Sequence, residues 1–290
     1  MKYLNMYKVS KGASAIDFYL ISKGEYVEKF LSKDNIPYES IACIGDGDID
    51  ESFLFIEGVK MVGAPANASC RIRDKVLKSA NGFLSDHSYY NGFEDFFWKA
   101  KEVGVEYIFT DFNGVLLEGI NLDAFHDLLI DVCKGLLPKL VIVTGASVGQ
   151  MSQHMLNLGI REAIRTSVDL FARENLIIMC ENGAFTIDLL TGQVNANVSL
   201  KNFKKNKRIR SEFYKKLEEV VYKEFGFELT HEYESQKNKV FLPMKYTMIS
   251  VNIPKSDEND NDFRASKESR RFADIVEQEF FSTYNLLENE

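Results

Sequence analysis

Along most of the chain, short apolar runs alternate with stretches in which apolar residues recur at helical spacing. The runs are rich in β-branched residues and are followed by turn residues, which is typical of buried strands. Strands that alternate with helices predict an α/β fold, with a parallel sheet and helices on both of its faces. We expect strands at residues 40–44, 59–62, 83–84, 107–110, 140–143 and 176–180, and helices at about 22–36, 53–55, 70–79, 91–103, 123–135 and 147–157.

The two ends of the chain have a different pattern. Partial alternation at residues 3–9 and 15–21 predicts a hairpin. After residue 201 the sequence becomes more charged, and the α/β core is therefore expected to span about residues 22–200. In the last part of the chain we expect helices at about 203–225 and 264–284 and strands at 227–231 and 246–253.

Composition and charge narrow the class of protein. The chain has 290 residues, of which 45% are hydrophobic and 27% are charged, as in ordinary soluble globular proteins. Its net charge of −8 does not favour nucleic-acid binding. The basic run from Lys201 to Arg210 has no aromatic ladder beside it, so we interpret it as an exposed helix face and expect no nucleic-acid partner.

Neither a membrane segment nor a metal-binding cysteine motif is visible. No apolar stretch reaches membrane-spanning length, and residues 1–8 lack the apolar core of a signal peptide, so we expect a soluble cytoplasmic protein without a membrane partner. The four cysteines lie far apart, without the spacing that zinc requires. Cys43 and Cys180 lie in apolar runs and are expected to be small buried residues.

Candidate chemistry is concentrated where predicted strands end. Asp111 follows the strand 107–110, a cluster of carboxylates at residues 46–51 follows the strand 40–44, and Thr144 and Gly145 follow the strand 140–143. Ligands of open α/β sheets bind at such strand ends. A carboxylate there can attack phosphorus or bind Mg²⁺. A further acidic run at residues 256–262 lacks the spacing of a calcium loop and is interpreted as a solvated loop.

Together these motifs resemble the haloacid dehalogenase-like hydrolases, and in particular their sugar-phosphatase branch, which carries a cap of αββ repeats. The resemblance makes Asp111 the nucleophile of motif I, Thr144 the hydroxyl of motif II and Lys23 the lysine of motif III. Asp46 and Asp50 match the acidic pair of motif IV. The stretches Val62–Ser69 and Glu181–Ala184 also resemble segments of that branch.

The resemblance implies a Rossmann-like core, a Mg²⁺ cofactor and a small phosphorylated metabolite as ligand. The residues implied to bind the metal are Asp111, Asp46, Asp50 and Asn113, the last through its backbone carbonyl. The residues implied to hold the phosphate or substrate are Gly114, Gly145, Asn67 and Asn182. Lys11 also precedes a glycine and competes with Lys23 for motif III, but it lies too early for the helix that leads to motif IV.

The order of the motifs departs from the family. Motifs III and IV, at residues 23–50, precede motif I, and each motif occurs once. A circular permutation opened inside the cap explains this order, with residues 22–200 as the core, residues 1–21 and 201–290 as an α+β cap, and Phe96 to Val105 as the new connection. A swapped homodimer is the alternative.

One substitution affects the expected mechanism. Family phosphatases have a second aspartate two residues after the nucleophile, whereas this chain has Asn113, which cannot exchange a proton. Val115 and Ile49 also depart from the motifs. We therefore expect a Mg²⁺-dependent phosphatase that forms an aspartyl-phosphate on Asp111, or an impaired relative, natural or engineered, that binds a phosphorylated ligand. An unrelated nucleotide-binding protein is disfavoured because the chain has no GxGxxG or P-loop.

Overall fold

In a computed structural model, the chain folds into two compact units. One unit is Ile21–Asn197, and the other combines Met1–Leu20 with Val198–Glu290. The structure describes residues 7–11, 15–167, 175–188, 191–198, 200–232, 239–254 and 267–288. The acidic run at 256–262, the residues before Tyr7 and the expected start of the last helix near 264 lie outside these residues.

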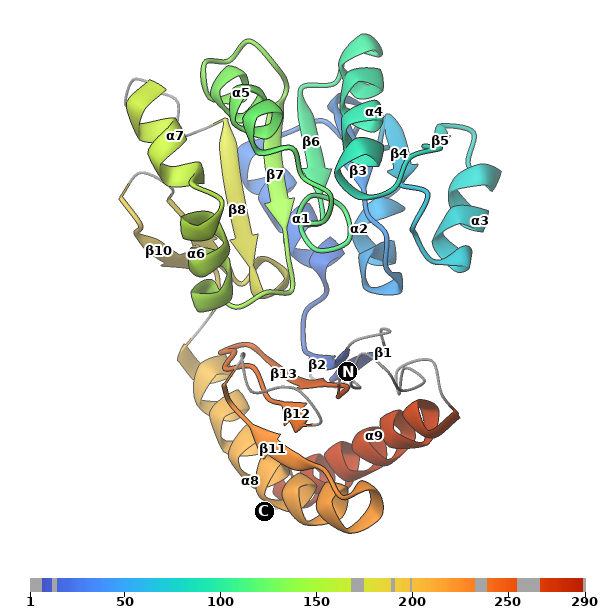
Figure 1. Cartoon of the computed structure of the whole chain (residues 1–290), viewed down its shortest axis with the longest axis vertical. Helices are drawn as coiled ribbons and strands as arrows, with labels where there is room; N and C mark the ends of the chain where they lie inside the picture. The colour runs from blue at the N-terminus through green and yellow to red at the C-terminus, as the bar shows by residue number, and fades with distance from the viewer. Residues whose placement is uncertain are drawn as a thin grey trace. The chain divides into compact units, whose positions relative to one another are not determined.

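The unit Ile21–Asn197 is built on an eight-stranded sheet in the order β10-β9-β8-β7-β6-β3-β4-β5. The six strands from β8 to β5 run parallel, and β9 and β10 are antiparallel additions at one edge. The predicted α/β fold with a parallel sheet is therefore confirmed (Figure 1). The strands are β3 (Ile41–Ile44), β4 (Met61–Ala64), β5 (Gly82–Leu84), β6 (Tyr107–Thr110), β7 (Lys139–Val143), β8 (Leu176–Cys180), β9 (Phe185–Ile187) and β10 (Val194–Ala196).

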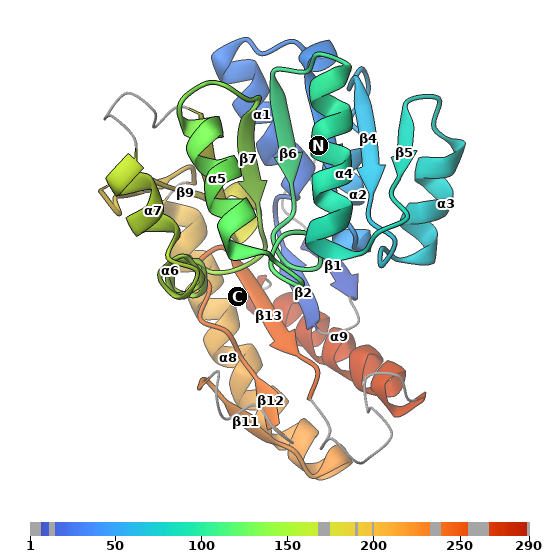
Figure 2. The ribbon, with the colours of Figure 1, turned by 45° about the horizontal axis from the view of Figure 1, so that its top comes forward.

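Helices cover both faces of this sheet. Val27, Phe53 and Ile72, from α1, α2 and α3, join one apolar core with strand residues such as Phe109. On the opposite face lie α4 and α5, which are drawn in front of the strands in Figures 1 and 2. The helices are α1 (Lys23–Asp34), α2 (Glu51–Leu54), α3 (Cys70–Lys78), α4 (Tyr89–Glu102), α5 (Leu122–Cys133), α6 (Val148–Asn157) and α7 (Ile160–Ser167).

The second unit has a five-stranded sheet in the order β1-β2-β13-β12-β11, with two long helices. The strands are β1 (Lys8–Lys11), β2 (Ala15–Tyr19), β11 (Glu228–Thr230), β12 (Lys239–Phe241) and β13 (Met248–Asn252), and the helices are α8 (Leu200–Phe225) and α9 (Lys267–Glu288). The hairpin predicted near the N-terminus is confirmed, since β1 and β2 pair antiparallel. Because β2 also pairs with β13, the two ends of the chain share one sheet. Phe18, Phe213 and Phe280 form the centre of its core.

Four short elements were not predicted, namely α7, β9, β10 and β12. Each of the three strands has three residues, and all three residues of β10 are exposed, so it carries no apolar period for the sequence to reveal. The cysteine prediction is confirmed, because Cys43 and Cys180 are fully buried. Within the described ranges, no helix combines the length and apolar character needed to cross a bilayer.

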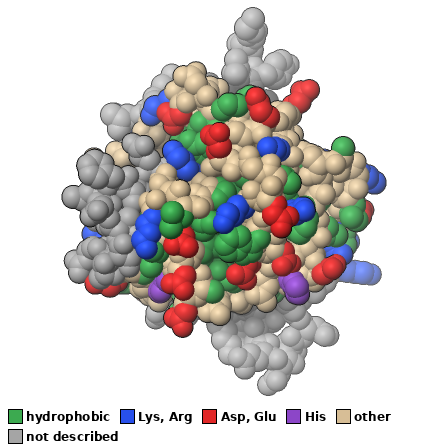
Figure 3. Space-filling model, turned by 90° about the horizontal axis from the view of Figure 1, so that it is seen from above, with side chains coloured by type: hydrophobic (Ala, Val, Ile, Leu, Met, Phe, Trp, Pro, Cys, Tyr) green, Lys and Arg blue, Asp and Glu red, His purple; other side chains and the backbone are tan. Residues whose placement is uncertain are grey.

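Charges of both signs are mixed on the one face of the molecule that Figure 3 shows. On the face shown in Figure 3, Lys and Arg side chains are interspersed with Asp and Glu around apolar side chains. Among the described residues on that face, no continuous stretch of positive charge is visible. The basic run from Lys201 to Arg210 lies within α8.

Candidate active site

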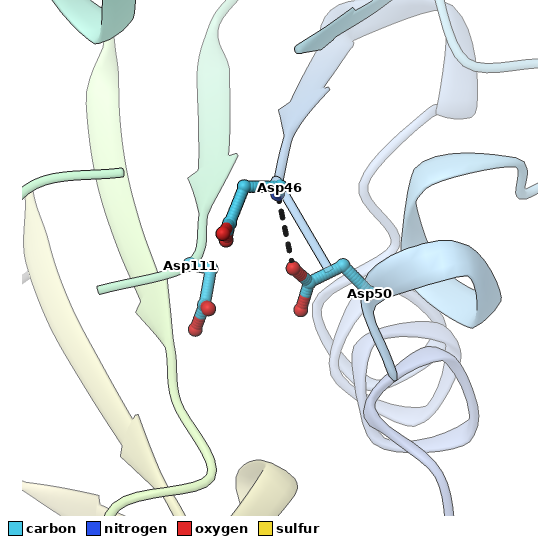
Figure 4. Close-up of side chains that lie close together, drawn as sticks. All are labelled: Asp46, Asp50 and Asp111. Atoms are coloured by element: carbon cyan, nitrogen blue, oxygen red, sulfur yellow. Dashed lines mark hydrogen bonds between the residues drawn. The ribbon is translucent and has the colours of Figure 1, made fainter. Parts of the chain in front are cut away.

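Two parallel neighbouring strands bring the first carboxylates together. Strand β3 pairs with β6, and Ile44 lies opposite Thr110 at their carboxyl ends. The backbone N–H of Asp111 continues this pairing by donating to the carbonyl of Ile44 at 3.1 Å. Asp111 and Asp46 therefore leave the sheet at the same edge, as Figure 4 shows.

A short turn adds the third carboxylate. Asp50 ends the 3-10 turn Asp48–Asp50, and its Oδ2 accepts hydrogen bonds from the backbone N–H groups of Asp46 (3.2 Å) and Gly47 (3.0 Å). Gly45 permits this approach, because a Cβ at that position would lie 2.7 Å from the Cβ of Asp50. One carboxylate oxygen from each of Asp46, Asp50 and Asp111 lies within 4.8 Å of the others (Figure 4).

Lys23 inserts an ammonium group among these carboxylates. Its Nζ lies 2.6 Å from Oδ1 of Asp50 and 2.8 Å from Oδ1 of Asp111. The side chain is 1% exposed and extends from the first residue of α1. A capping box fixes that helix start, since Ser22 and Glu25 exchange side-chain and backbone hydrogen bonds. Lys11, the competing lysine, instead pairs with Asp274 in the other unit, at 2.8 Å.

The charges in this cluster are not balanced. Burial and the charge of Asp50 outweigh Lys23 and raise the pKa of Asp111 to about 7. Burial, Asp50 and Asp111 raise the pKa of Asp46 to about 8. Burial lowers the pKa of Lys23, but Asp111 and Asp50 outweigh it, so this pKa is raised and the lysine stays charged. A bound divalent cation would favour the ionised carboxylates, and three ionised carboxylates beside one ammonium carry two net negative charges, which suits a hard cation with oxygen ligands.

Thr144 and Gly145 lie at the end of the next strand, β7. The Thr144 side chain is fully buried, and its Oγ1 accepts a hydrogen bond from the backbone N–H of Ala146 at 3.1 Å. Asn113, which is exposed, places its Nδ2 3.5 Å from the same Oγ1. The hydroxyl of Thr144 thus lies beside the turn that follows Asp111, at the start of the segment leading into α6.

The two asparagines expected to hold substrate differ in their surroundings. Asn67 uses both atoms of its amide on the backbone: Nδ2 donates to the carbonyl of Gly114 at 2.8 Å, and Oδ1 accepts from the N–H of Tyr89 at 2.7 Å. Asn182 is 1% exposed, and neither atom of its amide has a partner among the described residues. The backbone N–H of Asn182 donates to the carbonyl of Thr144 at 2.9 Å.

Gly114 is required by the packing of the Asp111 turn. Its φ is +76°, in the left-handed region, and a Cβ there would lie 2.2 Å from Oδ2 of Asp46. Its N–H donates to the carboxylate of Glu118 at 2.7 Å. Glu118 also contributes to the raised pKa of Asp46 and was not among the predicted site residues. An exposed glutamate in a turn carries no sequence signal that would single it out.

The fold and the site define an α/β protein with a carboxylate–lysine cluster at the carboxyl edge of its parallel sheet. No protein-family model matches the chain, and no curated protein matches it.

Structures of a Plasmodium falciparum IMP-nucleotidase resemble part of the chain. One is 13% identical, with a TM-score of 0.41 over 64% of this chain and 43% of that one. An IMP-bound mutant is 14% identical, with a TM-score of 0.35 over 64% and 49%. An IMP-bound form with a truncated N-terminus is 11% identical, with a TM-score of 0.31 over 63% and 58%. The matches span less than two thirds of those chains, and at this similarity they assign no activity to this one.

Proposed function

We propose that the protein is a Mg²⁺-dependent phosphatase of a small phosphorylated metabolite, with a sugar phosphate as the expected substrate class. The observation that carries this proposal is the position of the Lys23 ammonium, within 2.8 Å of both Asp111 and Asp50, at a cluster that includes Asp46. A phosphate monoester is a dianion, so a carboxylate can attack it only where positive charge offsets the repulsion. A buried lysine beside a strand-end aspartate supplies part of that charge.

The residues that would hold the metal are Asp46, Asp50 and Asp111, with the backbone carbonyl of Asn113 as a further oxygen. Their donor set fits Mg²⁺, because every donor is an oxygen and the three carboxylates, when ionised, exceed the charge of the Lys23 ammonium by two negative charges. When bound, Mg²⁺ would supply positive charge that offsets the phosphoryl oxygens. Lys23 would still be needed beside the metal, because the fold holds its positive charge at a fixed position next to Asp111.

In the proposed reaction, a carboxylate oxygen of Asp111 forms a bond to phosphorus while the bond from phosphorus to the ester oxygen breaks. The leaving oxygen takes a proton from water, and a second water then hydrolyses the aspartyl-phosphate to release inorganic phosphate. Thr144 and the N–H groups near the start of α6 would hold phosphoryl oxygens, and the free amide of Asn182 is available for the same purpose. Asn113 cannot give or take a proton in either step.

A second candidate function follows from Asn113. Without an acid at this position, the protein could bind a phosphorylated ligand and turn it over slowly or not at all, since general acid–base help contributes about 100- to 10,000-fold. The retained cluster of Lys23, Asp46, Asp50 and Asp111 favours the phosphatase over the binding protein. Ligand binding alone does not require a carboxylate nucleophile in contact with a lysine.

We also propose that the chain is a circularly permuted member of the haloacid dehalogenase-like hydrolases. The support is that β3, which leads to motif IV, precedes β6 and β7 in the chain but lies directly beside β6 in the sheet, and that Lys23 at the start of α1 reaches Asp111 after β6. In this proposal residues 22–200 form the core, the connection from α4 to β6 is the new one, and residues 1–21 with 201–290 form the cap. In this proposal the cap sets the substrate specificity.

The test of the function is Mg²⁺-dependent phosphate release from a panel of sugar phosphates and an activated aryl phosphate. We expect Asn113→Asp to raise the rate on sugar phosphates by about 100-fold or more, because it restores a proton donor. The aryl phosphate should gain less, since its leaving group needs no proton. Asp111→Ala should abolish release from both.

Two other outcomes separate the candidates. Phosphate release that is unchanged in Asp111→Ala would contradict the phosphatase proposal, because the nucleophile would be dispensable. If neither the unsubstituted chain nor Asn113→Asp exceeds the Asp111→Ala background, while sugar phosphates still raise the melting temperature, ligand binding becomes the supported function. Light scattering on the same samples would distinguish a single permuted chain from a swapped homodimer.

A further inference from the structure

A groove lies on the face of the eight-stranded sheet that α1 covers only in part. It encloses about 790 Å³, and we call it the α1 groove. Ile177 and Met179 of β8 contribute to its apolar floor, and the second half of α1 forms one wall. Thr186 and Asn195 form the opposite wall. They belong to the β9–β10 hairpin, which extends the sheet beyond β8 at one edge (Figure 1).

Positive charge is concentrated in the α1 groove. Lys29, Lys33 and Lys139 line it, whereas Asp34 is the only carboxylate among the described residues that line it. Across the part of the chain that the structure describes, none of these three lysines forms an ion pair with a carboxylate. The whole chain has 35 basic and 43 acidic residues, so the groove has a net positive charge although the chain as a whole is negatively charged. The charges here are therefore available to a ligand.

Aromatic rings lie next to the lysines. The Nζ of Lys29 is 5.2 Å from the centre of the Tyr26 ring, and the Nζ of Lys139 is 5.2 Å from that of Tyr107. Phe30 adds a third ring to the lining. The ammonium groups of Lys29 and Lys139 thus lie over aromatic ring faces, so a ligand that enters the groove meets rings and positive charges side by side, which suits a ligand with an apolar ring and a negative group attached.

The α1 groove is distinct from the carboxylate cluster. None of Lys23, Asp46, Asp50 and Asp111 lines it. The two are nevertheless joined by α1, which begins with Lys23 and continues into the groove wall. They are also joined by Gly183, a lining residue that follows Asn182. A ligand in the groove would touch the helix that positions the lysine without touching the lysine itself.

From these features we propose that the α1 groove binds a small organic anion with an aromatic ring. Its volume is in the range of about 300–1,000 Å³ that is usual for small-molecule sites. The apolar floor would bury the ring, and the three lysines would neutralise the acidic group. The proposal does not depend on the phosphatase activity, because it concerns a different surface and is tested by binding alone.

The test uses the full chain and two probes of the same shape, 1-naphthalenesulfonate and the neutral 1-naphthalenemethanol. Calorimetry would measure affinity, and ¹H–¹⁵N shifts would locate the probe. We expect the sulfonate to bind, to shift residues such as Phe30, Ile177 and Thr186, and to bind at least about 10-fold more tightly than the alcohol. Added salt should weaken the binding of the sulfonate and leave the binding of the neutral alcohol unchanged.

Charge-matched variants make the test specific. The triple change Lys29→Gln, Lys33→Gln and Lys139→Gln should weaken sulfonate binding by about 10-fold, as expected for three partly solvated charges. The control triple, Lys78→Gln, Lys134→Gln and Lys223→Gln, removes the same charge from other surfaces and should leave the affinity unchanged. Equal affinity for both probes, equal loss in both triples, no detectable binding, or shifts confined to the carboxylate cluster would each overturn the proposal.

Discussion

Lys23 is the residue on which the carboxylate cluster depends. Asp50 is fully buried and Asp111 nearly so, and ionised carboxylates at such positions are costly unless positive charge lies beside them. The ammonium contacts both, while the phenyl ring of Phe53 lies 5.7 Å from it. The same group that would help to neutralise a substrate phosphate therefore also permits the site to exist in the folded state.

Replacing Lys23 with methionine should strongly destabilise the metal-free protein. The change keeps an apolar stem but leaves the buried carboxylates unpaired, and breaking a buried ion pair costs about 3–5 kcal/mol. Urea unfolding would measure the loss, and millimolar Mg²⁺ should recover part of it. Lys78→Met, on the exposed surface of α3, should change stability by less than about 0.5 kcal/mol. A Lys23→Met protein as stable as this control would show that the carboxylates do not need the lysine.

For individual residues, the sequence predicted which residues belong to the site better than it predicted which residues they contact. Asp111, Asp46 and Asp50 could be placed at one edge because each follows a strand or turn that an apolar pattern reveals. The hydrogen bonds of Asn67 to Gly114 and Tyr89 could not be predicted, since they join segments that are distant in sequence. The amide of Asn67 fixes the Asp111 turn through these hydrogen bonds, and its expected role in holding substrate stays a prediction.

The elements that carry the site owe their positions to close backbone packing. Helix α1 must approach α2 and the strand ends closely enough for Lys23 to reach Asp50 and Asp111. Gly24 permits this, because a Cβ at that position would lie 2.0 Å from the backbone carbonyl oxygen of Ser52. The helix start thus combines a capping box, a buried lysine and a glycine contact within the four residues from Ser22 to Glu25.

Because of this close packing, two Gly→Ala changes should have opposite effects on the free energy of unfolding. Gly24→Ala should destabilise the protein by about 1–3 kcal/mol, as overpacked sites do, and should lower the proposed phosphatase activity by displacing Lys23. Gly149→Ala, inside α6, meets nothing closer than 3.9 Å and should be neutral or stabilise by up to about 1 kcal/mol through helix propensity. Thermal unfolding of both variants checks this. If both shift in the same direction, close packing at Gly24 is not the cause.

The strands of the parallel sheet and the helices beside them were predictable, whereas α7, β9, β10 and β12 were not. Apolar runs that end at turn residues reveal most of the buried strands, and apolar residues at helical spacing reveal the helices. Strands β9, β10 and β12 have three residues each, and their pairing depends on neighbours rather than on their own sequence. The α1 groove escaped prediction for the same reason, since it requires the β9–β10 hairpin.

At the scale of the whole molecule, the second unit depends on both ends of the chain. Strand β2 lies between β1 and β13, so residues near the N-terminus complete a sheet whose other strands come after residue 198. The Phe18 ring of β2 lies 3.9 Å from the ring of Phe280 in α9 and 5.8 Å from that of Phe213 in α8, measured between centroids. This unit therefore cannot be complete until the entire chain is present.

Phe18→Ala should consequently unfold the second unit selectively. Removing a fully buried phenylalanine costs about 3–5 kcal/mol, and this ring joins β2 to both long helices. Hydrogen exchange should show lost protection in α8, α9 and β13, while β6 and β7 remain protected by their separate core. Phe109→Ala, a matched change in the Ile21–Asn197 unit, should give the reverse pattern. Loss of protection in both units from either change would mean that the chain unfolds as one cooperative body.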